Sequence, residues 1–281
     1  MCDTVAAMSR YRIPKLSRVR RSVVPLAIVT LVAGCAEPSL EHAEEDLKAR
    51  PPSQVELKIT VKSNQIDKAR AGLKLVASQA ERREVFFYDT HELALFERGV
   101  ILRARKKLGA KDDSTVKLRP LTAGEVEKSW FAMDGFKCEV DSFGNKSVES
   151  CSLTSPQDSG EIDEVRAGGR AIKKLYAATQ ELFLADYAET PAWNELEVLG
   201  PVAVQAWQLH RSEVASDVNV ELWTLPDGAR VLEVSTRASV KAATARLAEL
   251  TALLKKLGLD ASGAQETKTK AALTFFTADA P

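Results

Sequence analysis

A short stretch of the chain places several cationic side chains on one face of a predicted strand. Residues 100–107 read VILRARKK, and because side chains alternate along a strand, Arg103 and Arg105 point to the same side. The rigid fork of N–H donors in arginine matches phosphate oxygens, so two arginines on one face are suited to contact a polyphosphate. The same charges also suit a solvent-exposed edge strand. The segment alone leaves both interpretations open.

Other predicted strands carry charged residues at the same two-residue spacing. Glu56 and Lys58 share one face, and Lys117 and Arg119 share another, while Glu221 and Glu233 lie on the polar faces of two later strands. If these faces meet inside a closed barrel, the carboxylates can hold a divalent metal while the cations bind phosphates, with few waters to screen them. If the faces point outward, they form an ordinary soluble surface.

The elements that would position these residues follow from hydrophobic periodicity. Residues 54–62 alternate between apolar and polar side chains, as a half-buried strand does, and a helix is expected to follow from Ser63. A last helix is expected to run from Ser239 to Gly258, a residue suited to end it. We expect further strands at 85–89, 100–106, 115–119, 129–133, 195–199, 217–225 and 230–236, a hairpin around Cys138, a helix at 171–184 and a loop at 160–169.

The N-terminus indicates a targeting segment. Arginines and a lysine between residues 10 and 21 precede an apolar run, residues 23–33, that is too short to span a bilayer, and residues 31–35 read LVAGC. This sequence resembles the lipobox of bacterial lipoproteins. The resemblance implies a signal peptide at 1–34, a lipid on Cys35 and attachment to a membrane through that lipid. An ordinary signal peptide or an uncleaved anchor is the alternative.

The resemblance to lipoproteins also implies a place in the bacterial cell envelope. Ala36 after the lipidated cysteine is typical of sorting to the outer membrane, on its periplasmic face. Residues 35–53 are polar and contain Pro51 and Pro52, which suits a tether between the lipid and a folded domain at 54–277.

Cysteine usage and charge narrow the possibilities further. With Cys2 cleaved off and Cys35 lipidated, Cys138 and Cys151 remain in an oxidising compartment, where we predict a disulfide across a hairpin. Two free thiols or a metal half-site are the alternatives, although three histidines in the chain argue against zinc. The chain has net charge +0 and 6% aromatic residues, and it lacks a basic stretch interleaved with aromatics. We therefore expect no nucleic-acid partner.

The order of the motifs resembles the CYTH superfamily, the triphosphate tunnel metalloenzymes, which include thiamine triphosphatases, inorganic triphosphatases and a class of adenylate cyclases. The family opens with Glu-x-Glu-x-Lys, and this chain has QVELK at 54–58. The other matching motifs are Tyr88-Asp89-Thr90, Gly99, Arg103-Ala104-Arg105, TVKLR at 115–119, Val220-Glu221, LEVS at 232–235 and TKTK at 267–270.

The resemblance implies an α+β fold, an antiparallel eight-stranded β-tunnel or barrel with helices packed outside. It implies that a triphosphate or polyphosphate ligand is bound by basic residues, together with Mg or Mn held by acidic ones. The implied phosphate-binding residues are Lys58, Arg103, Arg105, Lys117, Arg119 and Lys268. The implied metal ligands are Glu56, Glu233 and Glu221.

Two departures from the family pattern affect the predicted chemistry. Gln54 stands where the family has its first glutamate, and Ser235 stands where it has a later one, so each position lacks a negative metal ligand. Glu195 and Glu197 offer a replacement acidic strand. The sequence therefore leaves two predictions: metal-dependent hydrolysis of triphosphate or polyphosphate compounds, or an envelope lipoprotein that binds such anions or is purely structural, with a degenerate metal site.

Overall fold

The computed structural model describes residues 54–144, 146–261 and 266–278. The lipobox, Cys35 and the predicted tether lie outside the described residues, so the expectations for them stay predictions. Among the residues described, no helix is both long and apolar enough to cross a membrane.

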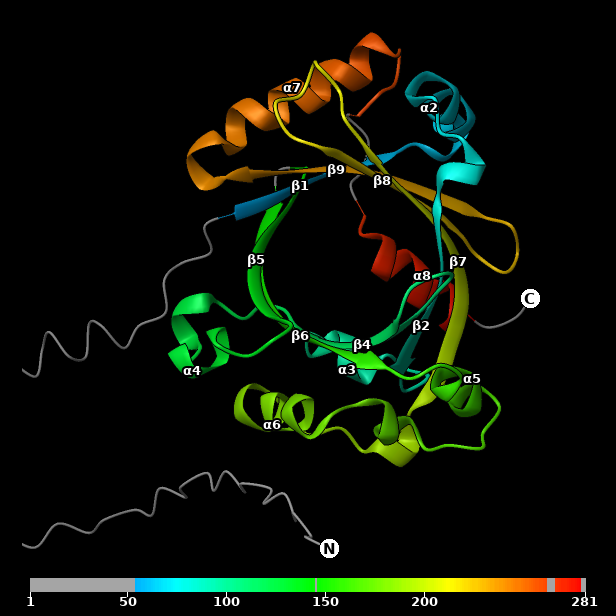
Figure 1. The fold of residues 1–281 in the computed structure, drawn as a ribbon, viewed down its shortest axis with the longest axis vertical. Coiled ribbons are helices and arrows are strands. Elements are labelled where there is room, and N and C mark those ends of the chain that lie inside the picture. The colour runs from blue at the N-terminus through cyan, green and yellow to red at the C-terminus, as the bar shows by residue number, and fades with distance from the viewer. Residues whose placement is uncertain (1–53, 145, 262–265, 279–281) are drawn as a thin grey trace, which may run out of the picture. The chain divides into compact units, whose positions relative to one another are not determined.

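The described residues form a closed β-barrel of nine strands, with helices around it (Figure 1). The order around the ring is β1-β5-β6-β4-β3-β2-β7-β8-β9. The bounds are β1 Gln54–Val61, β2 Glu81–Asp89, β3 Val100–Lys107, β4 Asp112–Leu118, β5 Phe136–Phe143, β6 Lys146–Gln157, β7 Glu197–Leu209, β8 Val218–Thr224 and β9 Arg230–Ser239.

The predicted α+β barrel is confirmed, but its strand count and pairing differ from the prediction. A ring in which every neighbour is antiparallel needs an even number of strands, because direction must alternate around it. Nine strands therefore require a parallel pair, and this is β1 with β5, where Val55 lies opposite Val140 and Lys58 opposite Phe143. All the other pairs in this ring are antiparallel.

Alternation along β1 turns an apolar face outward and a polar face inward. Leu57, Ile59 and Val61 are buried, and the last two pack into a cluster with residues of α2 (Ile66–Leu73) and α7 (Ala243–Lys256). Each fully buried aliphatic side chain of this kind contributes about 1.5–3 kcal/mol to folding. Figure 1 shows α7 lying over β1 and β9. Because the helices cover the apolar face, the polar face is left for the barrel interior.

A second layer of helices covers the opposite side of the barrel. It consists of α3 (Ala94–Glu97), α4 (Lys128–Phe131), α5 (Glu161–Arg166) and α6 (Ala178–Tyr187). The Trp130 ring lies 5.3 Å from the Phe183 ring, measured between centroids, and thus joins α4 to α6. The strand predicted at 129–133 is wrong, because this tertiary contact holds the segment as a helical turn.

Two other local predictions also differ from the structure. The loop expected at 160–169 contains α5, where Ile162 and Val165 are buried and acidic residues in the first turn suit the helix dipole. The helix expected at 171–184 is a 3₁₀ turn, Ile172–Leu175, followed by α6. β7 extends ten residues past the predicted end at Leu199. Gly200 and Pro201 interrupt the apolar pattern and so ended the predicted strand, but the structure accommodates both opposite a register shift in β2.

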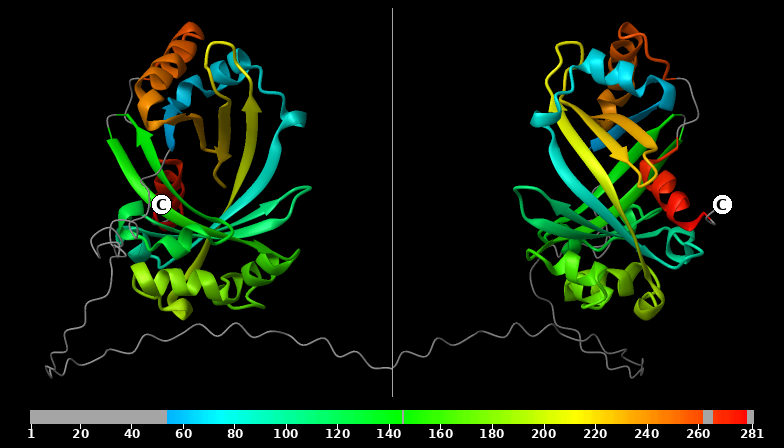
Figure 2. Two further views of the ribbon diagram at one scale, coloured as in Figure 1. Left: turned by 60° about the vertical axis from the view of Figure 1, so that its left-hand side comes forward. Right: turned by 90° about the vertical axis from the view of Figure 1, so that its right-hand side faces the viewer.

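The last helix, α8 (Lys268–Thr277), lies at one end of the barrel (Figures 1 and 2). The side chain of Thr267 caps it by accepting a hydrogen bond from the backbone N–H of Lys270 at 3.2 Å. Ala272 and Leu273 are buried in a cluster with Phe87 and other residues of β2, β7 and β8. This anchoring holds the start of α8 against the barrel interior.

The predicted disulfide between Cys138 and Cys151 is present. The two residues lie directly opposite each other on β5 and β6, with Cα atoms 4.0 Å apart. The disulfide therefore links two neighbouring strands whose inward side chains belong to the site described next.

Candidate functional site

A charged cavity of about 200 Å³ lies inside the barrel. It is lined by all six basic residues expected to bind phosphate and all three acidic residues expected to bind metal. These are Lys58, Arg103, Arg105, Lys117, Arg119 and Lys268, with Glu56, Glu221 and Glu233. The charged faces of the strands thus converge inward, and the interpretation of a solvent-exposed edge does not apply to them. That these residues bind phosphate or metal stays a prediction.

The register between β3 and β4 sets the partners of the two arginines. Arg105 lies opposite Asp113, and its Nε and Nη2 atoms each donate to that carboxylate at 2.8 Å. Arg103 lies opposite Thr115 and donates to its hydroxyl at 3.3 Å. The two arginines share a face, as the sequence predicts, but only Arg105 is neutralised by a carboxylate.

Arg103 is a half-buried cation with few partners. No ion pair to it is found in the described part of the chain, and its buried Nε has no hydrogen-bond partner there. Burial, with Arg105 close by, lowers the pKa of Arg103 to about 10. A half-buried positive charge that its own protein does not pair is the electrostatic arrangement expected where an anion binds.

Asp141 on β5 is the point where three cations of the cavity meet. Its carboxylate accepts from Lys58 Nζ at 2.6 Å and from Lys117 Nζ at 2.9 Å, and it also pairs with Arg119. The side chain is 1% exposed. The sequence analysis missed Asp141 and its neighbour Glu139. Their two-residue spacing was a usable signal, but the segment was interpreted only as a disulfide-linked hairpin.

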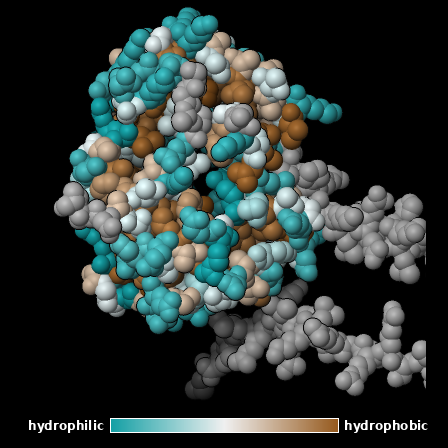
Figure 3. All heavy atoms as spheres, turned by 180° about the vertical axis from the view of Figure 1, so that it is seen from behind, coloured by the Kyte–Doolittle hydropathy of each residue, from teal (hydrophilic) through white to brown (hydrophobic). Residues whose placement is uncertain are grey.

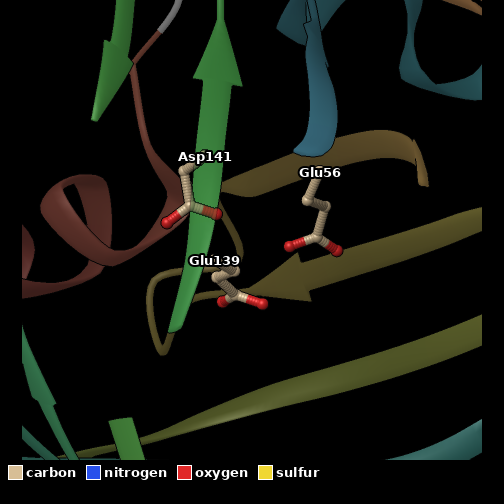
Figure 4. A group of neighbouring side chains, drawn as sticks. All are labelled: Glu56, Glu139 and Asp141. Carbon is tan, nitrogen blue, oxygen red and sulfur yellow. The ribbon is translucent and has the colours of Figure 1, made fainter. Parts of the chain in front are cut away.

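Glu56, Glu139 and Asp141 form an acidic group that could hold a metal ion. One carboxylate oxygen from each lies within 4.8 Å of the others, and Figure 4 shows Glu139 and Asp141 on one strand with Glu56 beside them. Burial raises the pKa of Glu139, but Lys117 and Lys137 outweigh it and hold that pKa well below its usual value. Charged oxygen donors in a compact group fit a hard cation such as Mg²⁺ or Mn²⁺.

The other two predicted metal ligands belong to a second ionic cluster, around Lys268. Lys268 Nζ lies 2.5 Å from Glu221 Oε2 and 2.8 Å from Glu233 Oε1, and 5.5 Å from the ring centroid of Trp223. Arg83 also contacts Glu221, at 3.3 Å. Sequence reasoning missed Arg83 because the predicted strand began at residue 85, whereas β2 begins at Glu81.

The positions that depart from the family pattern lie near this cavity but add no charge to it. Gln54 is exposed, and the buried Ser235 lies opposite Lys58 in the pairing of β1 with β9. Glu195 and Glu197, the proposed replacements, are exposed and do not line the cavity. Carboxylates of β5 instead supply additional acidic groups to the cavity.

The cavity adjoins a wider opening of about 900 Å³, with which it shares Glu56, Arg105, Glu221, Arg237 and Lys268. Figure 3, seen from behind, shows a hollow near the middle of that face with hydrophilic side chains along part of its border. A charged ligand can therefore approach along a polar surface before it reaches the cations inside.

Two solved structures have a similar fold. One is a protein from Bacillus halodurans described as a "putative adenylate cyclase"; it is 14% identical, with 79% of this chain and 97% of that chain covered and a TM-score of 0.54. The other is the "putative adenylyl cyclase HpAC1" from Hippeastrum, whose description reports a dominant triphosphatase activity; it is 16% identical, with 79% and 96% covered and a TM-score of 0.55. No protein-family profile matches the chain, and no curated protein matches it either.

The barrel of this chain has the same overall fold as these two proteins. In this barrel the interior is the charged part and the helix-covered exterior is the apolar part. The low sequence identity restricts the likeness to the fold, because one fold supports many functions. Function must therefore be argued from the side chains of the cavity.

Proposed function

We propose that this protein is a lipid-anchored triphosphatase of the bacterial cell envelope that hydrolyses triphosphate or polyphosphate compounds with a divalent metal. The observation that carries the proposal is the convergence of six cationic side chains and an acidic group on one enclosed cavity. The triphosphatase activity reported for the Hippeastrum protein of the same fold supports the choice of reaction.

Binding would use the cations that the cavity holds ready. Arg103 has no carboxylate partner among the described residues, so its guanidinium can donate to phosphate oxygens without giving up an ion pair. Lys58, Lys117 and Arg119 converge on Asp141 in the same cavity. A linear polyphosphate in this cavity would be contacted by Arg103 and by these three cations.

Hydrolysis needs little covalent chemistry from the protein. Phosphoryl transfer depends mainly on positioning and on charge stabilisation, so a nucleophilic side chain is not required when water attacks. Arg103 and Arg105 would stabilise charge on the transferred phosphoryl group, and Lys268 would hold the far end of the ligand. A bound Mg²⁺ or Mn²⁺, held by carboxylates of the acidic group, would supply Lewis-acid charge neutralisation on the phosphate oxygens.

Binding without hydrolysis is the second candidate, and Gln54 and Ser235 favour it. Both positions lack the carboxylate that the family pattern would place there, and each lost negative ligand weakens metal affinity. A barrel with this composition could retain the basic contacts to polyphosphate and lack the metal needed for turnover. Such a protein would be an anion-binding envelope lipoprotein.

The test is phosphate release from inorganic triphosphate by the full chain in detergent, with Mg²⁺, Mn²⁺ or a chelator. Metal-dependent release that Lys58→Ala and Glu56→Ala each abolish would support the enzyme. Lys62→Ala is the matched control, because Lys62 follows β1 directly and is exposed. This control should keep the activity of the unaltered chain.

Two other outcomes separate the remaining possibilities. Binding without release, with turnover gained in the double variant of Gln54→Glu and Ser235→Glu, would support the binding protein. If saturating triphosphate does not raise the melting temperature at all, both candidates fail, because a ligand that binds only the folded state must stabilise it.

A further inference from the structure

Asp141 accepts hydrogen bonds from more side chains than the other carboxylates of the acidic group do. Oδ1 accepts from Lys58, while Oδ2 accepts from Lys117 at 2.9 Å, from Arg119, and from the hydroxyl of Ser150 at 3.4 Å. With 1% of the side chain exposed, Asp141 is enclosed by the protein's own donors. A metal ion would have to displace at least one of these cations to reach it.

Glu56 and Glu139 are placed differently. Their side chains are 17% and 16% exposed, respectively, and both line a second opening of about 170 Å³ that Asp141 does not line. Solvent can therefore reach two members of the acidic group, while the third is almost fully buried. The three carboxylates lie close together, but they differ in accessibility and in the number of donors: Glu139 accepts from Lys117 and Lys137, whereas Asp141 accepts from four side chains.

The cations around Asp141 come from distant parts of the chain. Lys58 belongs to β1 and Lys117 to β4, and Arg119 follows the end of β4. Like charges repel strongly where few waters screen them. A carboxylate between them offsets this repulsion and fixes the direction in which each long side chain points.

Contact with Asp141 leaves these cations able to bind a ligand. An ammonium carries three N–H donors and a guanidinium five. Arg119 uses one nitrogen on Asp141, and Lys58 uses donors on Asp141 and Glu56, the latter at 3.0 Å. The donors that remain are available to the cavity, so Asp141 orients the cations from the wall and does not take the place of a phosphate.

We propose that Asp141 is a positioning residue, which holds Lys58, Lys117 and Arg119 in the arrangement that binds polyphosphate, and that the metal ligands of the acidic group are Glu56 and Glu139 alone. This inference rests on the proposed function. It assigns different roles to three neighbouring carboxylates: one organises the phosphate contacts, and two bind the cation.

The test compares Asp141→Asn with Glu139→Gln in the full chain and measures two dissociation constants for each. Triphosphate binding is measured by calorimetry without metal, and Mn²⁺ binding by electron paramagnetic resonance. Asp141→Asn should weaken triphosphate binding by at least about tenfold, or one decade of the dissociation constant. It should weaken Mn²⁺ binding less than Glu139→Gln does, because it removes a nearby negative charge but no metal ligand. Glu139→Gln should weaken Mn²⁺ binding by at least about tenfold.

The two measurements also exclude a purely structural effect, which would weaken both ligands together. Mn²⁺ binding that falls in Asp141→Asn as much as in Glu139→Gln would overturn the inference, as would triphosphate binding that is unchanged or tighter. If the unaltered chain binds no triphosphate, both the proposed function and the inference on Asp141 fail. If only the Asp141→Asn variant binds triphosphate as tightly as the unaltered chain, the inference on Asp141 fails and the proposed function stands.

A measurement on the unaltered protein covers the case in which Asp141→Asn does not fold. Crystals of the full chain soaked with Mn²⁺ should show anomalous density within coordination distance of Glu56 and Glu139, with Asp141 still contacting Lys58 and Lys117. Density that coordinates Asp141 would overturn the inference.

Discussion

Replacing Arg103 by methionine should make the protein more stable and unable to bind triphosphate tightly. Burial lowers the pKa of Arg103 well below its usual value, to about 10, and one pKa unit corresponds to about 1.4 kcal/mol. The charged guanidinium therefore costs the folded state about 3 kcal/mol, although Asp113 and Glu221 offset part of the burial cost without pairing with it directly. Methionine has a similar length without the charge, so we expect Arg103→Met to raise the free energy of unfolding by about 1–3 kcal/mol.

The same substitution removes charge-assisted hydrogen bonds to phosphate, each worth about 1.5–3 kcal/mol. Triphosphate affinity should therefore fall by at least about tenfold. Urea denaturation and calorimetry measure the two effects, with Arg82→Met as the control because Arg82 is an exposed residue of β2. A variant that is less stable than the parent, or that binds triphosphate equally well, would refute the assignment of Arg103 as an anion site.

Three further predictions follow from other parts of the molecule. Burial raises the pKa of Asp113, but the ion pair with Arg105 outweighs burial, and the pKa in the folded state is lowered. The ionised Asp113 therefore stabilises the folded protein above about pH 4, and this contribution is lost as the pH falls further. Asp113→Asn should reduce the fall in the free energy of unfolding, measured with urea, between about pH 4 and pH 2. Replacing Cys138 and Cys151 by serine should lower the free energy of unfolding by about 3 kcal/mol in guanidinium titrations, as reduction of the parent should. Cys35→Ser should move the protein from the membrane fraction to the soluble fraction on ultracentrifugation, and a variant that stays membrane-bound would contradict lipid anchoring.

Much of the barrel could be predicted because strand alternation is a local property. The strand expected at 54–62 is β1, and its apolar and polar residues lie on the faces expected of them. The turn at Gly258 could also be predicted, since its φ of +68° suits glycine at the end of a helix. Segments held by distant contacts were harder: α4 depends on Trp130 meeting Phe183, which no local pattern reveals.

The candidate site shows the same division between local and distant information. Spacing within single strands identified Arg103 with Arg105 and Glu56 with Lys58, and all four residues line the cavity. Arg83 was missed because the predicted strand began at residue 85, and Glu139 because its segment was interpreted only as a hairpin. Their partners on other strands, Glu221 for Arg83 and Lys117 for Glu139, were not visible in either segment. A charge on a strand is visible in the sequence, but its partner is not.

The sequence by itself determined which face of each strand is charged and where the hairpin cysteines lie, because these features depend on residue type and on the two-residue repeat of a strand. The six cations expected to bind phosphate came from the resemblance of the motifs to a known family. Only the tertiary structure decided how the ring closes, through the parallel pairing of β1 with β5. It also decided that Asp141, 83 residues from Lys58, lies where three cations meet. Pairing across a closed barrel depends on the register of every strand at once, and no short segment of the sequence carries that information.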